Sequence, residues 1–386
     1  MNKDRRKRIC FITVRHPSFG VGGSEVQSFL YAKEFASQGW DVYFLSKIHK
    51  EKIEGFDDPN ITELFYEGSR IGFFNHIKVL KLLVANKIEI IFFRNNTFQL
   101  GLLVLSGRLY KWRTIWSVKS DLTCGKDAAT IRARNNESSN GGFSIRNLQY
   151  AIEDKIFGYG VKNSYTILVQ NNYQYDVIKR DFNLDSTVLY SSAKIPIKPT
   201  KAENMVVFIA TIKYMKQPEL FCEIAQRLSN RGYRFLLIGS NYKDKEKADN
   251  LLELVAKSNV QYLGYQSLDS IREILRSTRL LINTSQFEGF PNSFVQAFTY
   301  GIPVASLNVD PDGIIEKYSL GIVANGDVDR LTIEVGKLLE NNDRWQQLSD
   351  NCYNFAKEKL NIKRSVSSLI ENFGNEAKEI SNRIRC

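Results

Sequence analysis

Residues 285–303 read S-Q-F-E-G-F-P-N-S-F-V-Q-A-F-T-Y-G-I-P, which predicts a loop that leads into a short helix. Gly289 and Pro291 disfavour regular structure in the loop. Asn292 or Ser293 is expected to cap the start of the helix, because such side chains accept hydrogen bonds from first-turn N–H groups. The start of a helix attracts anions through these N–H groups and through its dipole.

Glu288 lies on this loop in front of the helix, and Gln296 lies one turn inside it. A carboxylate beside a phosphate is repelled, whereas it suits the hydroxyl-rich part of a ligand. The pattern therefore predicts a sugar nucleotide, with its phosphates on the N–H groups and its sugar beside Glu288.

A pair of lysines follows another predicted strand, M-V-V-F-I-A at 205–210. Lys213 and Lys216 leave the carboxyl end of this strand, just before a helix that is predicted to begin at Pro218. A diphosphate could lie between the lysines and that helix. Lysines on a loop are usually solvated, so an ordinary solvated pair remains the alternative.

Glycines also follow the first predicted strand, Arg8–Val14, in a loop over Arg15–Glu25 before a helix over Val26–Gln38. Gly22 and Gly23 would let the backbone approach a phosphate or a sugar closely. A tight turn in which Ser24 or Glu25 caps the helix explains the pattern equally well.

Lys119, Ser120 and Asp121 follow the predicted strand R-T-I-W-S-V. Ligands of open α/β sheets bind beyond the carboxyl ends of the strands, so these three side chains are candidates for the acceptor side. Ordinary loop polarity is the alternative for each of them. The polar, glycine-rich stretch Ala128–Gly142 is interpreted as a mobile loop that closes over an acceptor.

Strands and helices alternate along the whole chain, which predicts an α/β protein with parallel sheets. A linker-like stretch, P-I-K-P-T-K-A-E-N, divides it. We predict a Rossmann-like domain over 1–195, a linker over 196–204 and a second Rossmann-like domain over 205–361. The chain after Asp327 is predicted to be helical, and the last helix, over 362–386, is predicted to cross back to the first domain.

Composition excludes several classes of protein. The 386 residues are 43% hydrophobic, enough for two cores. Five scattered cysteines and three histidines argue against a disulfide framework, a zinc site or a histidine metal cluster. No signal peptide is recognised, and no apolar run reaches the ~18 residues that span a bilayer. A cytoplasmic location is therefore expected.

The net charge of +11 is unevenly placed. Residues 1–200 hold 29 Lys and Arg against 19 Asp and Glu, whereas the remainder is nearly neutral. A basic half would suit an anionic membrane leaflet, with the protein peripheral on its inner face, or a lipid-diphosphate acceptor. A solvated basic surface is the alternative, and no nucleic-acid-binding module is recognised.

The chain resembles family 4 of the retaining glycosyltransferases over nearly its whole length. The resemblance rests on motifs in both halves: G-G-S-E at 22–25, A-T-I-K-Y-M-K-Q-P-E-L-F at 210–221, E-G-F-P-N-S-F-V-Q-A at 288–297, G-I-P-V-A at 301–305 and D-P-D-G at 310–313. It implies the GT-B fold, in which two Rossmann-like domains face each other across a cleft. The second domain would hold the sugar nucleotide and the first the acceptor.

Residue roles also follow from the resemblance. Glu288 matches the glutamate that contacts the transferred sugar, Lys216 the lysine that neutralises the leaving diphosphate, and Gly22 and Gly23 a loop beside phosphate and acceptor. The remaining donor-binding candidates are Gly289, Phe290, Pro291, Asn292, Ser293, Gln296 and Thr211. Ser24 is a further candidate for the acceptor side.

The chain departs from the family pattern at three places. Gln296 stands where the family has a second glutamate, and Thr211 where it often has an arginine. The histidine that usually follows the fourth strand of the first domain is replaced by the Lys119–Asp121 region.

The sequence therefore predicts a retaining enzyme that moves a hexose-type sugar from a nucleoside diphosphate to a glycan acceptor. The acceptor is expected to be polyprenyl-linked, in cell-surface polysaccharide or lipopolysaccharide biosynthesis. Lys216, Lys213 and the helix start would stabilise the departing diphosphate without a metal or cofactor. The alternatives are a sugar-nucleotide 2-epimerase of the same fold, and a non-catalytic adaptor, for which Gln296 and Thr211 argue.

Overall fold

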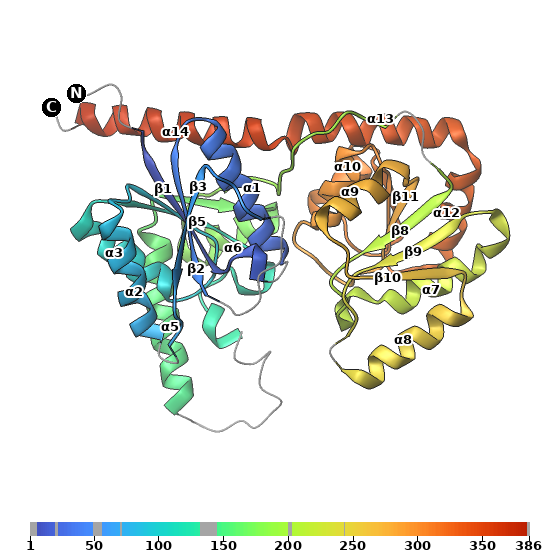
Figure 1. The fold of residues 1–386 in the computed structure, drawn as a ribbon, viewed down its shortest axis with the longest axis horizontal. Coiled ribbons are helices and arrows are strands. Elements are labelled where there is room, and N and C mark those ends of the chain that lie inside the picture. Colours follow the sequence, from blue (N-terminus) through green and yellow to red (C-terminus); the bar gives the residue numbers. More distant parts are fainter. Residues whose placement is uncertain are drawn as a thin grey trace. The chain divides into compact units, whose positions relative to one another are not determined.

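The computed structural model describes residues 6–19, 22–48, 56–69, 72–131, 145–199, 203–242 and 244–383. The chain divides into two units (Figure 1). One unit comprises Met1–Tyr190 and Ile362–Cys386, and the other comprises Ser191–Asn361. The change from one unit to the other thus falls after Tyr190, a few residues before the boundary expected from the linker composition.

Unit 1 is built on a seven-stranded sheet in the order β3-β2-β1-β4-β5-β6-β7, in which every pair of neighbours is parallel. Such an order is the doubly wound Rossmann arrangement extended by one strand. Its strands are β1 (Arg8–Arg15), β2 (Asp41–Lys47), β3 (Ile61–Tyr66), β4 (Ile90–Phe93), β5 (Arg113–Ser117), β6 (Thr166–Val169) and β7 (Thr187–Val188).

Helices cover both faces of this sheet because its strands are apolar on both sides. They are α1 (Gly23–Ser37), α2 (Gly72–Ala85), α3 (Gln99–Tyr110), α5 (Ile145–Lys162), α6 (Asn172–Phe182) and α14 (Ile362–Arg383). Short 3-10 turns occupy Pro17–Phe19 and Asp121–Thr123.

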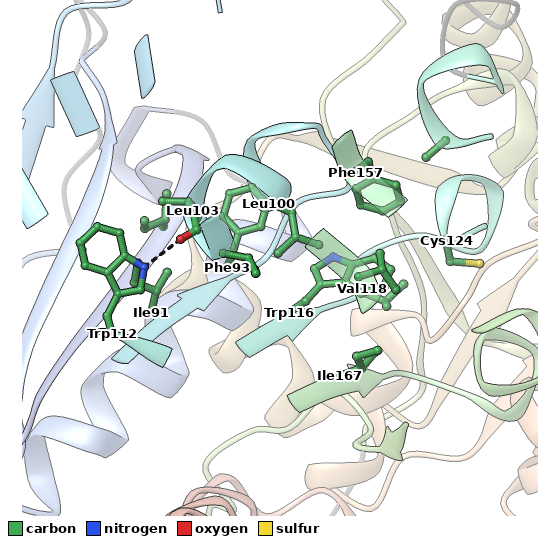
Figure 2. Packing of buried hydrophobic residues seen from close by; sticks show 14 of the residues in the cluster. Ile91, Phe93, Leu100, Leu103, Trp112, Trp116, Val118, Cys124, Phe157 and Ile167 are labelled. Carbon is green, nitrogen blue, oxygen red and sulfur yellow. Dashed lines mark hydrogen bonds between the residues drawn. The ribbon is translucent and has the colours of Figure 1, made fainter. Parts of the chain in front are cut away.

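Alternate residues of β4 face opposite layers. Phe92 stacks on Tyr31 of α1, with ring centroids 5.9 Å apart. Phe93 belongs instead to the cluster that contains Leu103 of α3 and Trp116 (Figure 2). In the same cluster Trp112 donates through Nε1 to the Leu103 carbonyl at 2.9 Å.

Close packing of α3 on α5 depends on glycine. A Cβ on Gly101 would lie 2.0 Å from the Ile156 carbonyl oxygen, and one on Gly160 would lie 2.5 Å from the Gly101 nitrogen. Only residues without side chains fit this contact.

The C-terminal helix α14 belongs to unit 1 although it follows unit 2 in sequence. It packs on α1, where Ser367 donates through Oγ to Gln38 Oε1 at 3.2 Å, and Phe373 meets the Trp40 ring edge-on. Unit 1 is therefore completed by the end of the chain.

Unit 2 contains a six-stranded parallel sheet in the order β10-β9-β8-β11-β12-β13, again the Rossmann order. Its strands are β8 (Met205–Ile209), β9 (Arg234–Ile238), β10 (Val260–Gly264), β11 (Leu280–Asn283), β12 (Val304–Ser306) and β13 (Gly321–Val323). Its helices are α7 (Pro218–Arg227), α8 (Lys245–Lys257), α9 (Leu268–Ser277), α10 (Asn292–Thr299), α11 (Ile314–Lys317), α12 (Val328–Glu340) and α13 (Asn342–Lys359), with 3-10 turns at Tyr214–Lys216, Ser229–Arg231 and Pro311–Gly313.

The prediction of two parallel-sheet Rossmann-like units is confirmed, and so is the helical character of the chain after Asp327. Two strands were missed: β3, which carries Thr62 and Glu63 near the sheet edge, and the three-residue β13. Helix α1 was predicted to start at Val26, but it starts at Gly23, because Gly22 already has the extended backbone of an N-cap. Within the described residues, no helix is both long and apolar enough to cross a membrane.

Candidate active site

The carboxyl ends of β8 and β11 lie side by side in unit 2, at the point where the strand order reverses. Ligands of doubly wound sheets bind at such a switch point. The loops that leave these two strands are tied together, because Thr284 donates through Oγ1 to the carbonyls of Lys216 at 2.9 Å and Gln217 at 2.7 Å. The Gln286 N–H donates to the Met215 carbonyl at 2.9 Å.

This junction brings the two most important candidates into contact. Lys216 Nζ and Glu288 Oε2 are 2.5 Å apart, and each side chain is 16% exposed. The other carboxylate oxygen of Glu288 accepts from Ser285 Oγ at 2.7 Å and from Asn283 Nδ2 at 3.1 Å. Three partners thus hold the Glu288 carboxylate at the mouth of the sheet, and it in turn holds the Lys216 ammonium group, with part of each side chain still open to solvent.

Helix α10 begins differently from the prediction. Its N-cap is Pro291, not Asn292 or Ser293, and no side chain caps it. Proline at this position fixes an extended backbone, with φ −63° and ψ 128°, so the next residue already enters the helix. First-turn N–H groups of a helix lack intrahelical partners, and here Asn292 Oδ1 is also buried without a hydrogen-bond partner. Gly301 ends the region with φ +70°, as a left-handed cap.

The loop after β8 is pressed against the end of β9. A Cβ on Gly239, which has φ +151°, would lie 1.7 Å from the Ala210 carbonyl oxygen. The Ile212 N–H donates to the Ser240 carbonyl at 3.2 Å. Thr211 and Lys213 nevertheless have exposed side chains on this loop, whereas Lys216 points into the junction.

The D-P-D-G motif has a structural role in this unit. Asp310 accepts hydrogen bonds from the N–H groups of Ile315 at 2.8 Å and Glu316 at 3.3 Å, and so caps α11. Burial raises the pKa of the Asp310 carboxyl above its ordinary value, while these two bonds act against the rise.

In unit 1 the glycines lie at the start of α1. Gly22 is the N-cap, and Gly23 is the first helical residue. The Glu25 carboxylate folds back over this helix start, because a Cβ on Gly22 would lie 2.2 Å from Glu25 Oε2. Ser24 Oγ is buried without a hydrogen-bond partner. The N-cap Gly22 makes no side-chain hydrogen bond, so capping and ligand contact both stay predictions for this loop.

Asp121 is engaged in the architecture of unit 1. Its Oδ1 accepts from Asn171 Nδ2 at 3.1 Å and from Gln174 Nε2 at 2.6 Å, and Asn171 in turn caps α6. The carboxylate therefore joins the loop after β5 to the loop after β6. Lys119 and Ser120 precede it and are half-buried. Of the stretch predicted to close over an acceptor, residues 132–142 lie outside the described residues.

Sequence reasoning missed the connection from β4 to α3, R-N-N-T-F at 94–98. Arg94 is 6% exposed, donates through Nη1 to Ser117 Oγ at 3.4 Å, and has a buried Nε without a partner. Burial lowers the pKa of its guanidinium, and the attraction of Tyr31 and Glu25 opposes this. Asn96 Oδ1 and Thr97 Oγ1 are also buried without partners. A polar run directly after a buried strand at the switch point between β1 and β4 was the available signal.

No cluster of three or more metal-ligating side chains is found in the part of the chain that the structure describes. Cys10, Cys124, Cys222 and Cys352 are buried thiols. Burial raises the pKa of the Cys222 thiol to about 11, which makes it a packing residue more than a nucleophile.

Part of the chain matches a known family model. Residues 203–341 match the family model described as Glycosyl transferases group 1. The amylovoran biosynthesis glycosyltransferase AmsD of Erwinia amylovora is 22% identical, in a match that covers 51% of this chain and 60% of AmsD. The chain thus spans about three fifths of the length of this curated relative. The matched residues 203–341 all lie in unit 2.

Solved structures extend the likeness to both units. HepE of Anabaena, solved with UDP and glucose, has a TM-score of 0.71 at 13% identity and covers 96% of this chain and 100% of its own. WaaG, a glycosyltransferase involved in lipopolysaccharide biosynthesis, has a TM-score of 0.67 at 13% identity, with 94% and 98% covered. At this identity the likeness shows the fold alone, which is GT-B.

Proposed function

We propose that this chain is a glycosyltransferase that moves a hexose-type sugar from a nucleoside diphosphate sugar to a glycan acceptor. The observation that carries the proposal is the Lys216–Glu288 pair at the switch point of unit 2, in front of α10. Lys216 suits a diphosphate, and Glu288 suits a sugar hydroxyl. A nucleoside diphosphate sugar contains both chemical groups and would contact both residues at once.

The reaction breaks the bond between the anomeric carbon and the β-phosphate oxygen, and the electron pair stays on the diphosphate. The acceptor hydroxyl forms the new bond to the anomeric carbon, and its proton goes to the departing phosphate or to solvent. Lys216, with Lys213 nearby, stabilises the charge that develops on the diphosphate. Glu288 holds the sugar by accepting from its hydroxyls. Retention of the anomeric configuration is part of the proposal.

The acceptor would bind at the switch point of unit 1. Supporting this, Arg94, Asn96 and Thr97 offer buried polar atoms without partners there, which a hydroxyl-rich ligand could satisfy. We further propose a lipid-linked acceptor in the biosynthesis of a cell-surface polysaccharide. AmsD and WaaG, by their descriptions, act in amylovoran and lipopolysaccharide biosynthesis.

A panel of nucleoside diphosphate sugars, offered with and without a lipid extract as acceptor, tests the proposal. We expect one donor to release its nucleoside diphosphate only when acceptor is present. Glu288→Ala and Lys216→Ala should abolish most of this release, whereas Lys247→Ala, on α8, should not. Undiminished release in both site variants would refute the assignment. A C2-epimerised sugar without acceptor would favour an epimerase, and donor affinity without turnover an adaptor.

A further inference from the structure

The outer side of α2 and α3 in unit 1 exposes large apolar side chains. Phe73 and Phe74 are 56% and 52% exposed at the start of α2, and Leu105 and Leu109 on α3 are 53% and 73% exposed. Tyr110 continues the row at the end of α3. The outer side of a helix on a solvated surface is normally polar. An exposed apolar surface of this kind marks a site that binds a partner with apolar groups.

Leu80, Leu105, Leu109 and Tyr110 form one continuous surface, because α2 and α3 are in contact. His76 Nε2 of α2 and Ser106 Oγ of α3 are 3.2 Å apart. Leu80 of α2 lines a shallow groove together with Leu105 and Leu109 of α3, and Val84 shares the neighbouring groove with Tyr110.

The charge on the same helices is of one sign. Between positions 68 and 120 the sequence contains nine Lys and Arg, and Glu89 is its only acidic residue. On α2 and α3 and directly after them, Lys78, Lys81, Lys87, Arg108 and Lys111 are exposed. Glu89, just after α2, is the one carboxylate that lines the groove shared by Lys87 and Lys111. Lys78 Nζ donates to the backbone carbonyl of Glu67 at 2.8 Å.

We infer that this apolar and basic side of α2 and α3, the docking face, binds the surface of an anionic lipid bilayer. A bilayer accepts both components, because apolar side chains enter the acyl boundary while lysines and arginines attract the phosphates. A second copy of the chain would bring the same positive charge. Protein interfaces are, moreover, depleted of lysine at their centres.

The inference goes beyond the transfer reaction. It rests on the proposed function only in that a lipid-linked acceptor would explain why a transferase docks there. Membrane binding and donor turnover can therefore fail separately.

Sedimentation of the full chain with vesicles tests the docking face. We expect binding to phosphatidylcholine vesicles that contain phosphatidylglycerol, weaker binding to phosphatidylcholine alone, and loss of binding at high salt. Each lysine near an anionic surface strengthens binding by about fivefold. The triple variant Lys81→Gln, Lys87→Gln, Lys111→Gln should therefore bind about 100-fold more weakly.

A matched control removes three charges elsewhere. Exposed Lys245, Lys257 and Lys359 of unit 2, all changed to Gln, should leave vesicle binding within about twofold. The double variant Phe73→Gln, Leu109→Gln should weaken binding by at least about tenfold. An unchanged circular dichroism spectrum and an unchanged urea unfolding midpoint show that each variant is folded.

Three outcomes would overturn the inference: no binding to the anionic vesicles, equal losses in the two triple variants, or a dimer in light scattering that Leu109→Gln dissociates. Vesicle binding without donor turnover would refute the proposed function and leave the docking face standing.

Discussion

Removing the charge of Glu288 is expected to change diphosphate affinity and the rate of sugar transfer in opposite directions. In Glu288→Gln the side chain keeps an oxygen that can accept from Ser285 and Asn283, but the negative charge beside Lys216 is lost. In the wild type, the Lys216 ammonium group must give up its contact with the Glu288 carboxylate, 2.5 Å away, when the diphosphate binds. The variant removes this cost. Affinity for the nucleoside diphosphate should therefore rise, while transfer of the sugar should slow.

The size of both effects follows from the value of a hydrogen bond to a charged group, about 1.5–3 kcal/mol. Part of the pair is open to solvent, so we take the lower end for the diphosphate and expect about tenfold tighter binding. The sugar loses a charged acceptor in the transition state, and kcat/KM should fall by about 100-fold.

Calorimetry with the nucleoside diphosphate and steady-state kinetics with the sugar nucleotide measure the two quantities. Lys216→Met should weaken binding of the diphosphate by at least about tenfold. Lys213→Met, which changes an exposed lysine on the same loop, should have a smaller effect. If Glu288→Gln weakens diphosphate binding as much as Lys216→Met does, the two residues do not compete as we reason, and Glu288 is only a scaffold for the lysine.

Three further predictions concern the rest of the molecule. Transfer should continue within about twofold in excess EDTA, because lysines and the α10 dipole supply the countercharge; complete loss that Mg²⁺ restores would contradict this. Arg94→Gln should raise the KM for acceptor by about tenfold and leave diphosphate affinity unchanged; the opposite pattern would remove Arg94 from the acceptor side. Burial lowers the pKa of His76 from 6.5 to about 4, so the unfolded chain binds the proton first as the pH falls. The native state should therefore lose about 2 kcal/mol of stability between pH 7 and pH 5, measured by urea unfolding, and His76→Gln should reduce that loss.

Local patterns in the sequence were sufficient for the architecture. Buried parallel strands read as apolar runs, such as I-I-F-F in β4 and M-V-V-F-I in β8, and each is followed by a helical stretch. Strand β3 was missed because Thr62 and Glu63 interrupt its apolar run near the edge of the sheet. Helix starts were less well predicted, since a glycine or proline N-cap carries no side-chain signal.

The sequence by itself also pointed to Glu288 and Lys216 as candidates, because each follows a recognisable strand within a specific motif. It could not show that they touch. Their contact depends on β8 and β11 being neighbours, which is decided when strands distant in the chain pack into one sheet. The same holds for the partners of Asp121 and for buried Arg94. Short-range patterning determines which segments form the core, whereas only tertiary packing brings loops from separate strands together into a site.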